Sequence, residues 1–460
     1  MATRRGGGGA ARGFICGLAA LAITATSIPA ADAQQRIGFI RDAEIEDLMR
    51  DYANPILRAA GLGDSNVRVY VVNSTQFNAF VMDGRRIFIN AGVIMHADTP
   101  NEVIGVLAHE TGHIAGGHLA RLPMEIRGAT AIAVLTTVLG VGAMAAGAMG
   151  GASGGIDAGQ AMVMGGQHAA RRSLLSYQRS EELAADRAAV NYLNATGQSA
   201  KGMLRTFQRF ADQSMFSERN IDPYAQSHPM PRERIAALEE LAKQSPHFNR
   251  EDPPGLQARH DLARAKLAGH MEHPSAVQRR YPQSDNSLAA RYARAIVAMR
   301  SGSLSSALQS VDSLISAYPD YPYFWELKGD MLIRAGRPAE AIEPLRRALS
   351  LKPNPLIRAT LGHALVATGD PGRLEAAISE LRSAVNDEPD YAGAYRHLAQ
   401  AYGRADRIPE AELATAQGHF AGGDFEAAKR FAQRAKQGLP TGSPDWQKAD
   451  DIVRYRPPGS

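Results

Sequence analysis

The stretch VLAHETGHIAGGH, residues 106–118, places three histidines and one glutamate among small and apolar residues. Because four residues of an α-helix turn through about 400°, His109 and His113 lie on one helix face, one turn apart. Two imidazoles so placed can bind one zinc ion, and Glu110 can take a proton from a water molecule without ligating the metal. The alternative is a pair of buried histidines held by ordinary hydrogen bonds.

A third protein ligand is expected, because a catalytic zinc has three protein ligands and one open position. His118 is one residue too early for the pattern H-E-x-x-H-x-x-G-x-x-H, and a straight helix would carry it off the metal face. In SEELAADRAA, Glu182 and Asp186 share a helix face, so we predict Glu182 as ligand and Asp186 as acceptor of a ligand histidine's second N–H. Glu181 is the competing ligand; it lacks an acid four residues later, and we assign it to a solvated helix face.

The chain has 460 residues, too many for one hydrophobic core, so at least two domains are expected. With 51 basic and 47 acidic residues, the net charge of +4 gives no reason to expect a nucleic-acid partner. The only cysteine is Cys16, so no internal disulfide can form.

Residues 1–33 have the features of a secretory signal peptide. Arg4, Arg5 and Arg12 precede or flank the apolar stretch FICGLAALAITATSIP, and an A-x-A cleavage site ends at Ala33. We predict export and cleavage after Ala33, by either the general or the twin-arginine route. The alternative is a retained membrane anchor.

Residues 34–245 predict a mixed α+β domain that is mainly helical with a small sheet. The pattern indicates helices over 37–61, 101–122, 174–193 and 230–244, with Asn101 or Thr99 as the cap of the second, a strand over 67–72, and a hairpin in which Asp83-Gly84 forms a type I′ turn.

Residues 246–285 predict a linker or helical connection, 286–445 an all-α tetratricopeptide solenoid, and 446–460 a C-terminal tail. Pro319, Pro353 and Pro389 are spaced 34 and 36 residues apart, as the terminal prolines of such repeats require. Stacked helix pairs of this kind commonly offer a concave surface for binding proteins. The alternative is a purely structural extension.

The segment 128–156 contains no charged residue and is long enough to cross a membrane. A single crossing would place His113 and Glu182 on opposite sides, and a return within AGQAMVMGG (158–166) is too short. We therefore predict a helix and mobile loop that lie over the active site or make a peripheral membrane contact. The alternative is packing inside the domain.

HETGH with the later pair Glu182 and Asp186 resembles the zinc peptidase family that includes the CAAX prenyl protease and the heat-shock peptidase HtpX. The stretch NAFVMDGRRIFINAGV (78–93) resembles the hairpin and edge strand that precede the active-site helix in that family. His118 and Arg121 resemble its soluble bacterial branch, as does His228-Pro229 near Arg234. This resemblance covers essentially the whole chain after the signal peptide.

The resemblance implies a zincin-like domain with one zinc ion per subunit, bound by His109, His113 and Glu182, and catalysis by Glu110. It also implies a periplasmic role in quality control of outer-membrane proteins, with the repeats contacting the assembly machinery.

Two further roles are predicted near this site. An edge strand at Asn78, Ala79 and Phe80 could bind an extended substrate by β-addition, although an ordinary hairpin would have the same sequence. His228 could donate a hydrogen bond to the oxyanion or bind zinc as an extra ligand and hold the enzyme off. The alternative for His228 is a loop histidine with no role.

The leading hypothesis is a periplasmic zinc endopeptidase that cuts misfolded or stalled outer-membrane proteins. A second hypothesis is a chaperone or scaffold with a latent or structural metal site. A repeat adaptor without metal is the third.

Overall fold

The computed structural model describes residues 38–150, 153–216, 224 and 227–457. The predicted signal peptide lies outside these residues. From Phe39 onward the chain forms one unit of mutual contacts, an α+β domain followed by helical repeats, which confirms the predicted fold class.

The sheet has four short strands in the order β1-β2-β4-β3. β2 runs parallel to β4, while β1 and β3 are antiparallel to their neighbours, so β3 is an edge strand. The predicted strand at 67–72 and the predicted hairpin are both present. The bounds are β1 Phe39–Ile40, β2 Arg68–Val72, β3 Ala79–Asp83 and β4 Arg86–Asn90.

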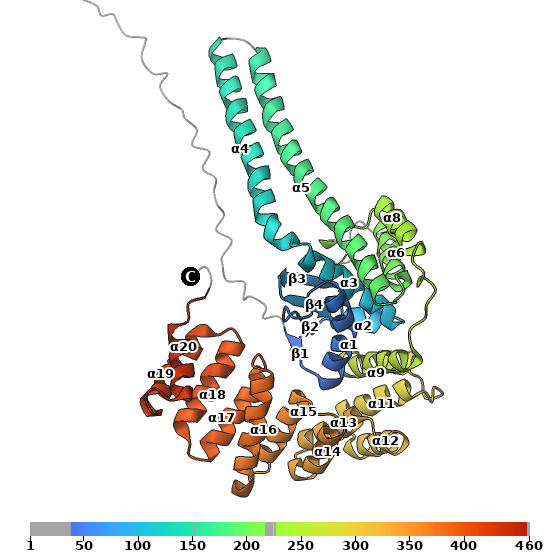
Figure 1. Cartoon of the computed structure of the whole chain (residues 1–460), viewed down its shortest axis with the longest axis vertical. Helices are drawn as coiled ribbons and strands as arrows, with labels where there is room; N and C mark the ends of the chain where they lie inside the picture. The colour runs from blue at the N-terminus through green and yellow to red at the C-terminus, as the bar shows by residue number, and fades with distance from the viewer. Residues whose placement is uncertain (1–37, 151–152, 217–223, 225–226, 458–460) are drawn as a thin grey trace, which may run out of the picture. The chain divides into compact units, whose positions relative to one another are not determined.

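The helices of this domain surround α3, whose residues from Pro100 to His113 are all buried. Helices α1, α5 and α6 pack against α3, and the sheet lies beside it (Figure 1). The bounds are α1 Ala43–Ala59, α2 Ala91–His96, α3 Pro100–Ala115, α4 His118–Gly150, α5 Ser153–Ala195, α6 Lys201–Phe216 and α8 Arg232–Lys243.

The predicted type I′ turn between β3 and β4 is wrong. The turn residues are Gly84 and Arg85, and neither Asp83 nor Gly84 has a positive φ. The Asp83 side chain instead accepts the Arg85 N–H at 2.9 Å, and a register shift between Val81 and Asp83 bends the strand. A side-chain-capped turn with a bulge therefore replaces the left-handed turn.

Two predicted helix boundaries also differ from the structure. The first helix begins at Ala43, capped by Asp42, because Phe39–Ile40 pairs with β2. The predicted helix 101–122 is interrupted at Gly116-Gly117, where Gly117 has φ +65°, a conformation that favours glycine. The chain turns there, so His118 starts a new helix. Asn101 is no cap, because α3 already begins at Pro100.

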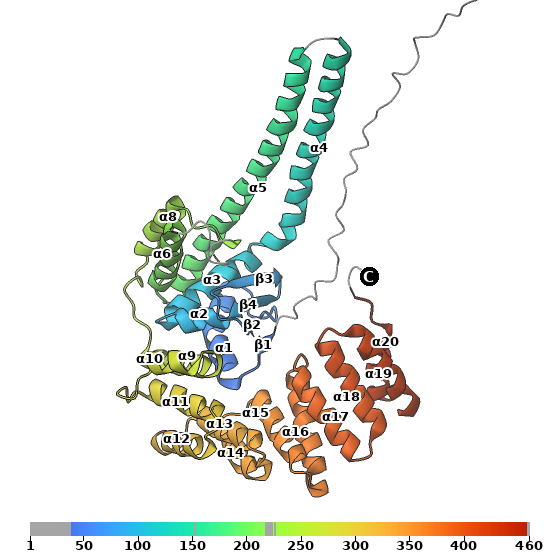
Figure 2. The same ribbon diagram turned by 180° about the vertical axis from the view of Figure 1, so that it is seen from behind.

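The segment predicted as a helix and mobile loop is a long helical hairpin. Helix α4 continues to Gly150 and α5 starts at Ser153, so α5 is far longer than the predicted 174–193. The two helices run side by side, away from the sheet and α3, in both views (Figures 1 and 2). The return limb judged too short from AGQAMVMGG is thus a continuous helix that leads directly into the Glu182 region.

The repeats consist of antiparallel helix pairs with their own hydrophobic cores. Pro319, Pro353 and Pro389 each follow the second helix of a pair by two residues. The bounds are α9 Pro254–Met271, α10 Pro274–Arg280, α11 Leu288–Arg300, α12 Leu304–Ala317, α13 Pro322–Arg334, α14 Pro338–Leu351, α15 Pro355–Ala367, η1 Pro371–Arg373, α16 Leu374–Asp387, α17 Ala392–Arg404, α18 Ile408–Ala421, α19 Phe425–Gly438 and α20 Pro444–Arg454.

A buried lysine joins α1 to the connecting helix α9 and the repeat helix α13. Lys266 Nζ lies 2.7 Å from Asp42 Oδ2, 3.2 Å from Glu44 Oε2 and 3.9 Å from Glu326 Oε2. Burial lowers the pKa of Lys266, but the charges of Asp42 and Glu44 outweigh burial and hold it well above its ordinary value. Burial raises the pKa of Glu326. One ammonium group thus compensates three carboxyl groups at this junction.

Lys266→Met should destabilise the protein by about 3–5 kcal/mol, because it leaves buried carboxylates without a counter-charge. Lys243→Met is the control, since Lys243 is 59% exposed in its pair with Glu239 and should change stability by less than about 1 kcal/mol. Urea unfolding at pH 7 measures both, and equal small losses would contradict the role of Lys266.

Candidate metal centre

Helix α3 presents His109 and His113 on one face, as predicted from their spacing. Their Nε2 atoms lie 3.1 Å apart, and both side chains are buried. Pro100 stands in the first turn of α3 and Gly116 caps its end, so the pair occupies the last two turns of a rigid helix.

Helix α5 supplies the carboxylates, and Gly112 lets it approach α3. A Cβ on Gly112 would lie 2.9 Å from the Ala185 carbonyl oxygen and 3.0 Å from its Cα. Because Gly112 has no side chain, the backbones of α3 and α5 touch between His109 and His113. Glu182, one turn before Asp186, therefore reaches the two imidazoles.

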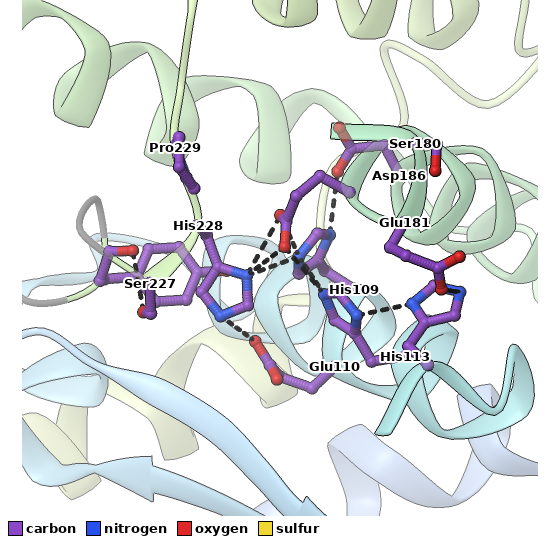
Figure 3. Close-up of polar contacts among 12 residues, drawn as sticks. His109, Glu110, His113, Ser180, Glu181, Asp186, Ser227, His228 and Pro229 are labelled. Atoms are coloured by element: carbon purple, nitrogen blue, oxygen red, sulfur yellow. Dashed lines mark hydrogen bonds and ion pairs between the residues drawn. The ribbon is translucent and has the colours of Figure 1, made fainter. Parts of the chain in front are cut away.

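Four donor atoms surround one point. His109, His113, Glu182 and His228 each offer an atom, and these atoms lie within 4.8 Å of one another (Figure 3). Glu182 carboxylate oxygens are 3.3 Å from His109 Nε2, 3.4 Å from His113 Nε2 and 3.1 Å from His228 Nδ1.

These distances match the edges of a tetrahedral zinc site. With bonds of about 2.0–2.1 Å, two ligand atoms of a tetrahedron lie about 3.3–3.4 Å apart. Five of the six separations between the four side chains are 3.1–3.4 Å, close to this range, and those to Glu182 involve both of its oxygens. The donor set therefore fits a zinc ion.

The spare nitrogen of His109 is held by a buried carboxylate. His109 Nδ1 lies 2.9 Å from Asp186 Oδ1, and Arg234 donates to both oxygens of Asp186 at 2.7 and 2.8 Å. Arg234 Nη1 also lies 2.7 Å from Glu182 Oε2. Asp186 thus lies where it was predicted, beside a histidine of the cluster, and the arrangement fixes which His109 nitrogen faces the metal position.

A second chain of contacts holds His113. Its Nδ1 lies 2.8 Å from His118 Nδ1, and His118 Nε2 lies 2.8 Å from Glu181 Oε2. Arg121 donates to both Glu181 oxygens. For His113 to donate its Nδ1 proton, His118 must accept at Nδ1 and donate from Nε2 to Glu181. The assignment of Glu181 to a solvated face is therefore wrong: its side chain is 14% exposed and fully engaged.

Glu110 is buried beside the cluster, and among the residues that the structure describes neither of its carboxylate oxygens has a hydrogen-bond partner. Its nearest basic group is His228 Nε2, 3.5 Å from Oε1. Burial raises the pKa of Glu110, and the charges of His228 and His109 oppose that rise. A buried, unsatisfied carboxylate next to a metal position is costly to keep, and it suits a group that exchanges protons.

The histidines differ in proton affinity. Burial lowers the pKa of His109, but hydrogen bonding to Asp186 and Glu182 outweighs burial and raises it to about 9. Burial, with the charge of His109, lowers the pKa of His113 to about 2. Glu182 has a pKa well below its ordinary value, because the charges of His228 and His109 outweigh its burial. Glu182 is thus an anion and His113 a neutral imidazole, the ligand forms that zinc requires, whereas His109 would have to release a proton to bind it.

The predicted substrate strand is the free edge β3. The bond of 2.8 Å from the Asn90 N–H to the Asn78 carbonyl makes these two residues a hydrogen-bonded pair. By the alternation of an antiparallel ladder, the main-chain groups of Ala79 and Val81 point away from β4. Ala79 is fully buried and Val81 partly exposed, so the edge is open at its Val81 end.

Comparisons with known proteins fit this geometry. A family model described as Peptidase family M48 matches residues 40–242, which hold every residue of the cluster. Residues 40–242 are thus similar to peptidase family M48. The chain therefore carries a metallopeptidase domain, and a tetratricopeptide repeat model matches residues 292–354 behind it.

Three curated proteins are similar to this chain. The beta-barrel assembly-enhancing protease of Escherichia coli (strain K12) is 26% identical over 383 residues, covering 81% of this chain and 75% of that protein. The protein of the same name from Yersinia pestis is also 26% identical, covering 77% and 72%. A putative one from Vibrio cholerae is 27% identical over 207 residues, covering 45% and 41%.

Sequence reasoning missed the contacts of His118, Glu181 and Arg121. The family resemblance had pointed to His118 and Arg121 without giving them contacts, and spacing alone could not show that the chain turns at Gly117.

Gly112→Ala should cost about 1–3 kcal/mol of stability, since the new methyl group must push α5 away from α3. Gly255→Ala is the matched control, because nothing lies within 4 Å of its added Cβ. Denaturant unfolding compares the two, and an undiminished stability of Gly112→Ala would show that the helices can separate at no cost.

Proposed function

We propose that this protein is a zinc-dependent endopeptidase, with His109, His113 and Glu182 as zinc ligands and Glu110 as general base. The observation that carries this proposal is the set of four converging donor atoms beside a buried carboxylate that has no hydrogen-bond partner in the described part of the chain. A purely structural metal site has no use for such a carboxylate.

The chain's own residues account for proton movement and positioning. When bound, zinc supplies a Lewis acid that polarises the scissile carbonyl and acidifies water. Glu110 takes the proton of the attacking water and returns it to the leaving amine; its raised pKa favours that return. Asp186 and His118 hold the rings of His109 and His113 in the orientation that faces the metal. The free edge of β3 aligns the substrate main chain beside them.

His228 occupies the fourth position of the tetrahedron in this conformation. Its Nδ1 is 3.3 Å from His109 Nε2, and its Nε2 faces Glu110. We propose that this arrangement is a resting form in which His228 fills the place that substrate and water need.

The place of action and the substrates are carried over from similarity. The relatives are named for enhancing β-barrel assembly, and the sequence begins with a predicted signal peptide. We propose a periplasmic enzyme that cuts misfolded or stalled outer-membrane proteins, with the repeats contacting the assembly machinery. Main-chain recognition at β3 suits substrates that share no sequence.

The second candidate is a periplasmic chaperone or scaffold with a latent metal site. Occupation of the fourth position by His228 is the observation that favours it, since a fully coordinated metal has no open site. Cleavage by an activated variant separates the two candidates.

Glu110→Gln should still bind one zinc per chain and should lose at least about 100-fold in kcat/KM on an unfolded protein such as casein. Glu251→Gln, an exposed glutamate outside the site, should leave both quantities unchanged. Metal analysis and a cleavage assay measure the two. Full activity in Glu110→Gln would remove it as the base, and absence of zinc from wild type would end the proposal.

His228→Ala should raise proteolysis more than tenfold, because it frees the fourth position, while zinc content stays at one per chain. His273→Ala, an exposed histidine in the connecting region, is the control. A tenfold fall would instead make His228 an oxyanion donor, and an unchanged rate would contradict both roles.

A further inference from the structure

The hairpin of α4 and α5 exposes an unusual amount of apolar surface. Within the segment His118–Ala146, the most apolar 18-residue window has a mean hydropathy of 1.9, yet only 6% of that window is buried. A core helix of that composition would be mostly buried, and this one stands far from the N-terminus. The exposed side chains with their exposed fractions are Ile132 40%, Val134 57%, Leu135 60%, Val138 64%, Leu139 53%, Val141 52%, Met162 42% and Met164 61%.

Small residues hold the two limbs together. A Cβ on Gly159 would lie 2.4 Å from the Gly140 carbonyl oxygen, and one on Gly166 would overlap the Thr136 side chain. In a lipid bilayer, burying apolar side chains between helices gives no hydrophobic gain in free energy, so helices associate by close backbone packing through glycine. The large side chains consequently point outward from the hairpin, where a water-soluble hairpin would bury them.

Three threonine hydroxyl groups of α4 form hydrogen bonds within their own helix. Thr130, Thr136 and Thr137 donate to the carbonyl oxygens four residues earlier, at 2.7, 2.8 and 2.7 Å. No polar atom of these three side chains depends on water, which is the requirement for a helix in hydrocarbon.

Charge is confined to the two ends of the shaft. Between Arg127 on one limb and Arg171 on the other, Asp157 is the only acidic or basic residue of the sequence apart from His168. Arg127, Arg171 and Arg172 are exposed at the base and have no ion-pair partner among the residues described. Three unpaired guanidinium groups in one belt suit the phosphates of anionic lipid headgroups.

The length of the shaft matches a bilayer. The rise from Arg127 to Ala146 is about 28 Å, against a hydrocarbon core of about 30 Å. Met144 packs against Gly159, so Asp157 lies at or beyond the level of Met144, about 25 Å from Arg127. That position is close to the far headgroup region, where a carboxylate is tolerated.

We propose that the α4–α5 hairpin inserts into the hydrocarbon core of an anionic lipid bilayer, with Arg127, Arg171 and Arg172 against the headgroups at its base. The metal centre would then stand just above the membrane surface, because His118 precedes Arg127 by nine residues of helix, about 14 Å. This contact with lipid does not depend on the peptidase chemistry. It would fix the distance between the metal centre and the membrane surface.

The competing occupant is an apolar stretch of an unfolded protein. Such a ligand would bind one face, whereas the exposed apolar side chains lie on both α4 and α5. The threonine hydroxyl groups also form hydrogen bonds within their own helix, so lipid is favoured.

The test is vesicle flotation of the full chain, purified from a bacterial host. Mass spectrometry of the intact protein determines where its N-terminus lies. Vesicles are phosphatidylcholine alone or with one quarter phosphatidylglycerol. Leu135→Asp/Val138→Asp is compared with Tyr318→Asp/Ile408→Asp, whose side chains are 50% and 51% exposed on the repeats. Thermal unfolding checks that each variant is folded.

Wild type and the repeat variant should float with the mixed vesicles, and the hairpin variant should lose at least tenfold of the bound fraction. Arg127→Gln/Arg171→Gln/Arg172→Gln should lose the preference for anionic vesicles. Failure of wild type to bind either vesicle would overturn the proposal, as would equal binding by the hairpin variant. If the hairpin variant no longer binds an unfolded protein such as casein but still floats with the vesicles, the exposed surface binds substrate instead of lipid.

Discussion

The contact between α3 and α5 at Gly112 is the constraint on which the site depends. His109 and His113 are fixed by one helix, but a zinc site needs a third donor, and that donor stands 69 residues beyond His113. The two backbones touch at Gly112 and Ala185, which places Glu182 within 3.4 Å of both imidazoles. A side chain at position 112 would separate the helices and open the cluster.

Around this contact, two sets of polar residues stiffen the ligands. Asp186 and Arg234 hold His109 from one side, and His118 with Glu181 holds His113 from the other. Each histidine thereby presents one defined nitrogen, which lowers the reorganisation needed to bind metal. The second set lies at the base of the α4–α5 hairpin, so the residues that hold His113 are on the same two helices as the exposed apolar surface.

The local features of the fold could be predicted from sequence. Helical spacing placed His109 and His113 together, and proline spacing gave the repeat phase, because both patterns depend on residues near one another in the chain. The pair Glu182 and Asp186 was found by its own spacing. The long hairpin was missed because a glycine-rich segment such as AGQAMVMGG (158–166) has low helix propensity. It is helical because it packs against α4.

Other features depend on contacts between distant residues, which spacing cannot show. The turn at Gly117 sends His118 back toward His113, and the register of β3 with β4 decides that Ala79 and Val81 face the free edge. Neither feature follows from the local sequence pattern. The residues around Gly117 are also compatible with a straight helix, and those of β3 and β4 with either strand register. The three-carboxyl cluster at Lys266 likewise unites residues more than two hundred positions apart.

X-ray absorption spectroscopy at the zinc edge of the purified resting protein tests the central claim most directly. The account predicts four-coordinate zinc with three imidazoles and one carboxylate at about 2.0–2.1 Å. A site with oxygen ligands alone, or a protein that takes up no zinc, would contradict it.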